Sequence, residues 1–158
     1  MDAYRIAEPR IVISTPSFLR GIFFKSEMGV DFRIGENFLR LVLTEVEANV
    51  PASENLIVIS RDLAEPMIDV ENIIEIGERG LFTPNEWVQI LYFNLVLKDN
   101  HFKTDSYNIS YLRLENEEIL AVYATFLGSS SRLWQLGANR LDARRRKDVG
   151  RRLFSRSQ

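Results

Sequence analysis

Few residues in this sequence have the side-chain chemistry of a catalytic centre, and the single histidine, His101, is the first of them. It lies in a polar segment, residues 99–105, that has an aspartate at each end. A histidine near a carboxylate is the usual combination for general base catalysis. The nucleophile that such a base would activate is not marked, because the chain has no cysteine and no Gly-x-Ser-x-Gly turn. The sequence therefore indicates a surface histidine in a loop rather than a catalytic one.

A row of acidic residues is the second candidate. Asp69, Glu71 and Glu75 lie on one side of residues 68–76, a segment that alternates between apolar and polar positions and predicts a strand. Alternate residues of a strand are about 6.6–6.8 Å apart, so these carboxylates would hold Mg²⁺ or Ca²⁺ only with ligands from elsewhere. We expect a solvated face or a surface that pairs with arginines, and neither a metal ion nor a cofactor. A small enzyme that uses His101 or this face is kept as an alternative.

Basic residues are concentrated at the C-terminal end of the chain. Residues 1–131 contain 11 Lys or Arg and 20 Asp or Glu, a net charge of −9, whereas residues 132–158 contain nine basic and two acidic residues, a net charge of +7. Arginine recognises carboxylates and phosphates alike through paired N–H groups. The residues predicted to bind a partner or a phosphate are Trp134, Arg140, Arg144, Arg145, Arg146, Lys147, Arg151 and Arg152.

Three roles are compatible with this basic segment. It could dock onto an acidic protein surface of its own chain or of a partner, contact nucleic-acid phosphates with strong salt dependence, or serve as a solubilising tail. Only Phe154 lies among the arginines as an aromatic that could stack on a base. The acidic remainder would also repel a polyanion over a Debye length of about 8–10 Å. Protein docking is therefore favoured, with a nucleic-acid-associated accessory protein as the alternative.

The aromatic residues are expected to pack in the core, with a ligand cavity as the alternative, since most of them fall on apolar faces of predicted elements. Trp134 is set apart because it lies outside the strongest predicted elements and next to the basic segment. Tryptophan is enriched where interfaces are tightest, so Trp134 is predicted to anchor an interface.

The elements that must position these residues are strands and helices in mixed order. Buried strands are predicted at residues 10–14 and 55–60, and helices at 16–25 and 35–50. The second helix has a strand as its alternative, because its leucines also alternate along the chain. Further on, residues 109–114 and 119–127 predict an antiparallel pair.

The strongest local signal begins at Thr83. The sequence Thr83-Pro84-Asn85-Glu86 combines a capping box with a proline at the first helical position. The helix that follows, up to residue 98, is apolar almost all round, so it must lie at the centre of the core or be covered by another subunit. Residues 140–152 predict a last helix with charge pairs at i,i+4 spacing.

Length and composition limit the class of protein. The chain has 158 residues, of which 46% are apolar and 27% charged, with no cysteine. This excludes a disordered chain and a disulfide framework, and it favours one core. Neither the first residues nor the most apolar stretch, residues 87–97, has the length and composition of a signal peptide or a membrane span. We expect a protein of the cytoplasm, or part of a particle assembled inside the cell, without membrane contact.

Together these features predict an α+β fold: a mixed or antiparallel sheet of about five strands with two or three helices packed on it, plus a basic C-terminal arm. The predicted boundary separates an acidic globular domain, residues 1–131, from the arm, residues 132–158. The favoured function is a non-enzymatic interaction or assembly subunit whose arm docks onto an acidic protein surface of a second copy or of a partner, including as a structural component of a larger particle.

Overall fold

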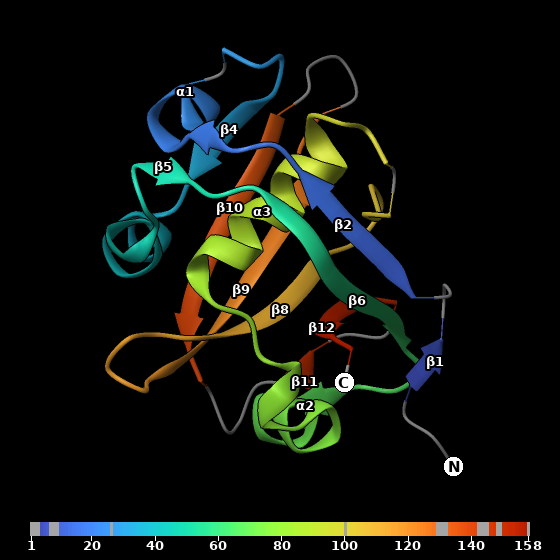
Figure 1. The fold of residues 1–158 in the computed structure, drawn as a ribbon. Coiled ribbons are helices and arrows are strands. Elements are labelled where there is room, and N and C mark those ends of the chain that lie inside the picture. The colour runs from blue at the N-terminus through green and yellow to red at the C-terminus, as the bar shows by residue number, and fades with distance from the viewer. Residues whose placement is uncertain are drawn as a thin grey trace.

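The fold is α+β, a strongly curled mixed sheet that surrounds one central helix (Figure 1). The structure is a computed structural model that describes residues 4–6, 10–25, 27–99, 101–128, 133–141, 146–147 and 150–157. The strands are β1 (Tyr4–Ile6), β2 (Ile11–Thr15), β3 (Phe18–Leu19), β4 (Asp31–Ile34), β5 (Asn49–Val50), β6 (Ser53–Leu63), β7 (Met67–Ile68), β8 (Asn108–Arg113), β9 (Ile119–Phe126), β10 (Leu133–Arg140), β11 (Arg146–Lys147) and β12 (Arg152–Arg156). The α-helices are α1 (Arg20–Phe24), α2 (Asp69–Ile76) and α3 (Pro84–Leu95).

Eight of these strands form the main sheet, in the order β1-β6-β12-β8-β9-β10-β4, with β2 also paired to β6. The predicted antiparallel pair is confirmed as β8 and β9, in register from Asn108 opposite Ala124 to Arg113 opposite Ile119. β12 is antiparallel to β6 and parallel to β8, so the last strand of the chain closes the middle of the sheet. Two small pairs, β11 with β7 and β3 with β5, lie outside the main sheet.

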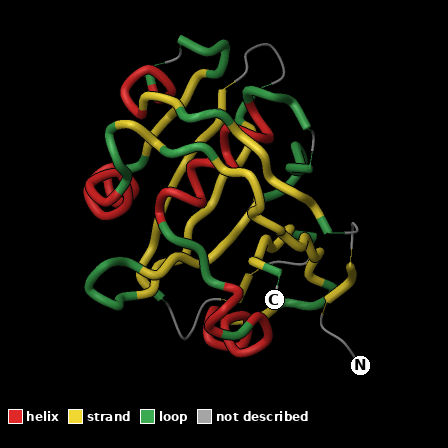
Figure 2. The backbone as a smooth tube through the Cα atoms, viewed as in Figure 1, coloured by secondary structure: helices red, strands yellow, loops and turns green. Residues whose placement is uncertain are grey.

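Helix α3 lies inside the curl of the sheet, with β2 and β6 on one side and β8, β9 and β10 on the other (Figure 2). The predicted capping box is present: the Thr83 hydroxyl accepts from the Glu86 amide at 3.2 Å, and the Glu86 carboxylate accepts from the Thr83 amide at 2.9 Å. Every residue from Trp87 to Leu95 is buried. The prediction that an all-round apolar helix lies at the centre of the core is therefore confirmed.

The sheet buries apolar side chains on both faces. The inner core, around α3, includes Phe23, Phe38, Trp87 and Leu136. The outer core lies between the opposite face of the sheet and α2, and consists of Leu63, Met67, Ile76, Leu81, Ile109, Tyr111, Ala121 and Leu153. The middle strands, β8 and β12, are therefore covered on both sides.

The predicted strand at residues 68–76 is wrong, because residues 69–76 form helix α2. Its buried positions, Asp69, Asn72 and Ile76, follow helical spacing, and two of them are polar. Because the buried stripe contains polar residues, the helical period is not visible in the pattern of apolar residues. The residues that suggested an apolar strand face, Val70 and Ile74, lie exposed on the helix.

The two N-terminal helices are shorter than predicted. Of residues 16–25 only α1 is helical, because Phe18 and Leu19 pair with β5 instead. Of residues 35–50, a helical turn covers Glu36 and Asn37, a π-helical turn covers Phe38–Val42 and a 3-10 turn covers Leu43–Glu45.

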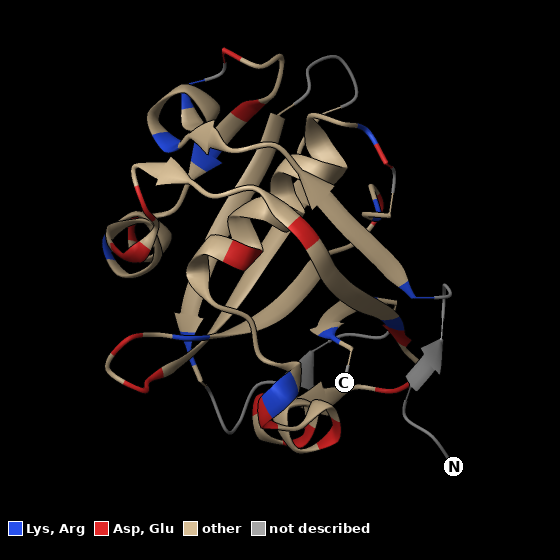
Figure 3. Ribbon diagram, viewed as in Figure 1, with Lys and Arg blue, Asp and Glu red and all other residues tan. Residues whose placement is uncertain are grey.

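The C-terminal segment is not a helical arm in the described residues. Residues 133–140 and 152–156 are β10 and β12 of the main sheet, so the boundary predicted at residue 131 does not separate two structural units. Leu153, Phe154 and Ser155 are almost fully buried, since β12 lies between β6 and β8. Figure 3 shows acidic and basic positions distributed over the whole described ribbon rather than at opposite ends.

Candidate functional site

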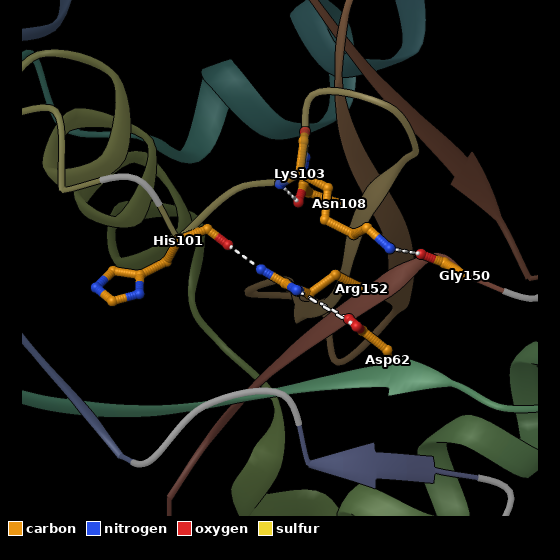
Figure 4. Close-up of polar contacts among 6 residues, drawn as sticks. All are labelled: Asp62, His101, Lys103, Asn108, Gly150 and Arg152. Atoms are coloured by element: carbon orange, nitrogen blue, oxygen red, sulfur yellow. Dashed lines mark hydrogen bonds and ion pairs between the residues drawn. The ribbon is translucent and has the colours of Figure 1, made fainter.

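Arg152 is the centre of a polar junction at the start of β12 (Figure 4). Its Nε donates to Oδ1 of Asp62 at 2.8 Å and its Nη2 to Oδ2 at 3.3 Å, while its Nη1 donates to the carbonyl of His101 at 2.9 Å. Only 15% of the Arg152 side chain and 21% of the Asp62 side chain are exposed. Each of the three guanidinium nitrogens of this predicted binding residue thus donates a hydrogen bond within its own chain.

Asn108 and Lys103 complete the junction (Figure 4). The Asn108 side chain accepts from the Lys103 amide at 2.7 Å and donates to the Lys103 carbonyl at 2.9 Å, as a neighbouring strand would. The Lys103 ammonium donates to the Gly150 carbonyl at 2.7 Å. These contacts connect the loop before β8 to β6 and β12, which is a structural role.

His101 belongs to the same loop. Its ring stacks parallel to Phe93 with 6.2 Å between ring centroids, and its Nε2 lies 3.4 Å from Oδ1 of Asp99. Its amide donates to the Asn94 side chain at 2.9 Å. These contacts tie the loop to the end of α3 and resemble those of a structural histidine.

The acidic residues predicted to share one strand face are separated by the helix. Asp69 is buried and its Oδ1 accepts from the Tyr111 hydroxyl at 2.7 Å, whereas Glu71 accepts from the Ile68 amide at 3.1 Å at the start of α2. Glu75 is exposed. In the described part of the chain, no group of three His, Asp or Glu side chains is arranged to hold a metal ion.

The described basic residues of the C-terminal segment contact their own chain. Arg140 pairs with Glu118 and the Arg151 guanidinium lies 4.3 Å above the Tyr107 ring. Arg146 and Lys147 form β11, which pairs with β7 directly before the acidic helix α2. Arg144 and Arg145 lie outside the described residues. A separate basic arm is not confirmed.

Trp134 lies in the inner core with 7% of its surface exposed. Its ring is 5.8 Å from that of Phe102 and 5.4 Å from that of Phe126, measured between centroids. β10 lies between β9 and β4, and its Trp134 packs against other residues of the inner core.

A groove forms where the sheet is left open beyond the end of β12. β12 pairs with β6 from Asp62 to Val58, and the amide of Ser157 then donates to the Ile57 carbonyl at 2.8 Å. β6 begins four residues earlier, at Ser53, and there it pairs with β2 on its other edge only, as far as the described residues show. The segment 53–57 therefore presents a strand edge, which we call the open edge.

Helix α3 forms the opposite wall of the groove. The groove has a volume of about 580 Å³ and is lined by the open edge, the first two turns of α3 and the end of β12: Pro51, Ala52, Ser53, Glu54, Asn55, Leu56, Ile57, Thr83, Asn85, Glu86, Gln89, Arg156 and Ser157. Ligand sites typically have volumes of about 300–1,000 Å³. The Gln89 side-chain amide donates to the Pro51 carbonyl at 2.8 Å, so a backbone acceptor next to the open edge already faces this groove.

The charges of the groove are two carboxylates and one guanidinium. Arg156 pairs with Glu86, whereas Glu54 is exposed and has no ion-pair partner among the described residues. At the β12 end, the Nε of Arg156 and the Oγ of Ser157 are buried without a hydrogen-bond partner in the described structure. The groove is polar, carries a net negative charge and contains hydrogen-bonding groups for which the described fold provides no partner.

Of these groove residues only Arg156 and Ser157 belong to the basic segment that the sequence indicates as a binding segment, and the groove itself was not predicted. The open edge exists because β6 has 11 residues while β12 has five, and no local pattern relates the two lengths. The one local signal at the site, the capping box of Thr83 and Glu86, predicts a helix start and not a binding site.

No helix in the described part of the chain is long and apolar enough to cross a membrane. In comparisons with known proteins, no family model, no curated protein and no solved structure matched this chain. The function is therefore inferred from the geometry alone.

Proposed function

We propose that this protein is a non-enzymatic interaction subunit that binds an extended segment of a partner protein in the groove between the open edge of β6 and helix α3. The segment would add to the sheet as a further strand, in line with β12. Main-chain hydrogen bonds supply the affinity in this mode of recognition, and pockets for alternate side chains supply the specificity.

The open edge is the observation that carries this proposal. Backbone groups alternate sides along a strand, and the Ile57 carbonyl faces β12, where it accepts from the Ser157 amide. Asn55 lines the groove two residues earlier, where a register shift between Ser53 and Leu56 against β2 marks a β-bulge in the open edge. Unpaired strand edges are templates for pairing with another chain unless they are covered, charged or shortened.

The basic segment supports this function less well than the groove does. Arg140, Arg152 and Arg156 each form an ion pair with a carboxylate of the same chain. A docking arm must exchange such contacts for contacts to its partner, whereas the open edge has backbone groups to offer without breaking the fold. The predicted interaction role is retained, and the binding surface is assigned to the groove.

A library of random heptapeptides displayed on phage tests the proposal. The chain has no cysteine, so Glu54→Cys creates one attachment point at the groove for a bulky maleimide label, and Glu65→Cys creates a matched point on an exposed turn after β6. We expect enriched peptides to bind the wild type and the protein labelled at position 65, and to lose at least about tenfold in affinity for the protein labelled at position 54. No enrichment, or equal loss with both labels, would overturn the proposal.

A further inference from the structure

We infer that the segment bound in the groove alternates basic and apolar side chains, so that its recognition combines strand addition with charge complementarity to Glu54. This inference rests on the proposed function and specifies the chemistry of the partner. Three observations lead to it: Ile57 and Val12 are exposed apolar neighbours beside the groove, the groove has an excess of negative charge, and β12 fixes the position of the added strand.

The position of the added strand follows from β12. The Ser157 amide bonds to the carbonyl of Ile57, the residue of the open edge that lies next to β12. A partner segment that continues this line would lie about 4.8 Å from β6, with its side chains directed alternately toward α3 and toward the outer face of the sheet.

On the outer face the added strand would meet apolar neighbours. Ile57 is 37% exposed and its cross-strand partner on β2, Val12, is 54% exposed. Residues directly opposite or diagonal on one face of a sheet lie within side-chain contact. Apolar side chains on this face of the segment would therefore cover Ile57, and Val12 lies one strand further along the same surface.

On the groove side the added strand would meet carboxylates and amides. Glu54 on the open edge and Asn85, Glu86 and Gln89 on α3 line the groove together with one lining cation, Arg156. Arg156 already pairs with Glu86, which leaves Glu54 as the carboxylate that a basic side chain of the partner can meet. An acidic segment would instead place like charges beside Glu54 and would bind more weakly.

Three fluorescent heptapeptides test this chemistry directly: valine alternating with lysine, with glutamine, or with glutamate. At low salt we expect the lysine peptide to bind at least about threefold more tightly than the glutamine peptide, and the glutamate peptide to bind most weakly, as exposed charge pairs allow. The preference should decrease as salt is added, because the pair with Glu54 is exposed to solvent.

Charge reversal at residue 54 tests whether Glu54 is the source of the preference for the lysine peptide. Glu54→Lys should reverse the order of the lysine and glutamate peptides, whereas Glu65→Lys makes the same change in net charge on an exposed turn and should leave the order unchanged. Equal reversal by both variants would mean that only net charge matters and would overturn the inference.

Two further outcomes distinguish this inference from the proposed function. If all three peptides bind equally and a nitroxide on Ala52→Cys, at the margin of the groove, broadens their NMR signals while one at residue 65 does not, the groove binds strands without charge preference and only the inference fails. If none of the peptides binds, or if a nitroxide at either position has the same effect, strand binding at the groove fails as well.

Discussion

The phenolic hydroxyl of Tyr111, in the middle of the sheet on β8, donates a 2.7 Å hydrogen bond to Oδ1 of Asp69, the first residue of α2. The same hydroxyl accepts from Nδ2 of Asn72 at 3.0 Å. All three residues are at most 2% exposed. Helix α2 is thus fixed to the sheet by a buried polar contact as well as by the outer core.

Removing that hydroxyl should destabilise the protein. Tyr111→Phe preserves the ring in the outer core but leaves Asp69 and Asn72 without one of their partners. An unsatisfied buried polar group costs about 1–3 kcal/mol, and more if it is charged. We expect the free energy of unfolding, measured in urea, to fall by about 2 kcal/mol.

Tyr92→Phe is the matched control for this loss. Tyr92 is 8% exposed and stacks on Phe18, but its hydroxyl makes no hydrogen bond to the described residues. This variant should change the free energy of unfolding by less than about 0.5 kcal/mol. Equal effects of the two variants would show that the hydroxyl of Tyr111 is not what holds α2.

The same contact explains why α2 could not be predicted from the sequence. The period of a helix is visible when its buried positions are apolar, and here Asp69 and Asn72 occupy buried positions because Tyr111 satisfies them from a distant strand. Helix α3 is the opposite case. Its start is encoded by Thr83, Pro84 and Glu86 within four residues, and its all-round apolar surface requires the central position that it has.

Separating Asp62 from Arg152 should also destabilise the fold. Both side chains are mostly buried, and Asp62→Asn leaves the guanidinium without its counter-charge. Breaking a fully buried pair costs about 3–5 kcal/mol, so for this partly exposed pair we expect about 2–3 kcal/mol in urea unfolding. The double variant Asp62→Asn/Arg152→Gln should lose less free energy of unfolding than Asp62→Asn and Arg152→Gln lose in total when each is made alone. A double-mutant cycle measures this difference.

Arg140→Gln provides the comparison for this ion pair. Arg140 pairs with Glu118, but 66% of its side chain is exposed. Exposed pairs contribute about 0–1 kcal/mol, so the variant should stay within that range. A loss as large as that of Asp62→Asn would mean that burial does not distinguish the two pairs.

Gly137 on β10 is expected to tolerate no side chain. It pairs with Tyr123 on β9, and a Cβ at this position would lie 2.1 Å from the ring of that tyrosine. Gly137→Ala must displace the ring, and such overpacking costs about 1–3 kcal/mol. Thermal unfolding followed by circular dichroism should show this loss of stability. Tyr123→Ala should reduce stability less in the Gly137→Ala variant than in the wild type, because the clash with the ring is then absent.

Gly21 supplies the control for this substitution. It lies in α1, and a Cβ there would meet no atom within 4 Å. Gly21→Ala should leave stability unchanged or raise it by up to about 1 kcal/mol, because alanine favours the helix. The prediction for Gly137 is contradicted if both substitutions are neutral.

The groove depends on relations between segments that are far apart in the sequence, and for this reason it was not predicted. Ser53–Ile57 are an open edge only because β12 ends at Arg156, and the edge faces Gln89 only because α3 is enclosed by the curled sheet. The charge asymmetry of the chain is visible in the sequence, but it suggested an arm. β12 has only five residues, Arg152–Arg156, and its three central residues are all buried, so no alternation identified it among the arginines.

Truncation after residue 131 tests the assignment of the C-terminal segment to the fold. A chain of residues 1–131 lacks β10 and β12, and with them the buried side chains of Trp134, Leu136, Leu153 and Phe154. It also loses the 2.7 Å hydrogen bond from Ser110 to the Phe154 carbonyl. Each buried large apolar side chain contributes about 1.5–3 kcal/mol, and a domain has only about 5–15 kcal/mol in total. We therefore expect the truncated chain to show no cooperative thermal transition and poorly dispersed NMR spectra, whereas the full chain shows both a transition and dispersed spectra. A cooperative unfolding transition of residues 1–131 would instead establish the acidic part as an independent domain with a dispensable basic arm.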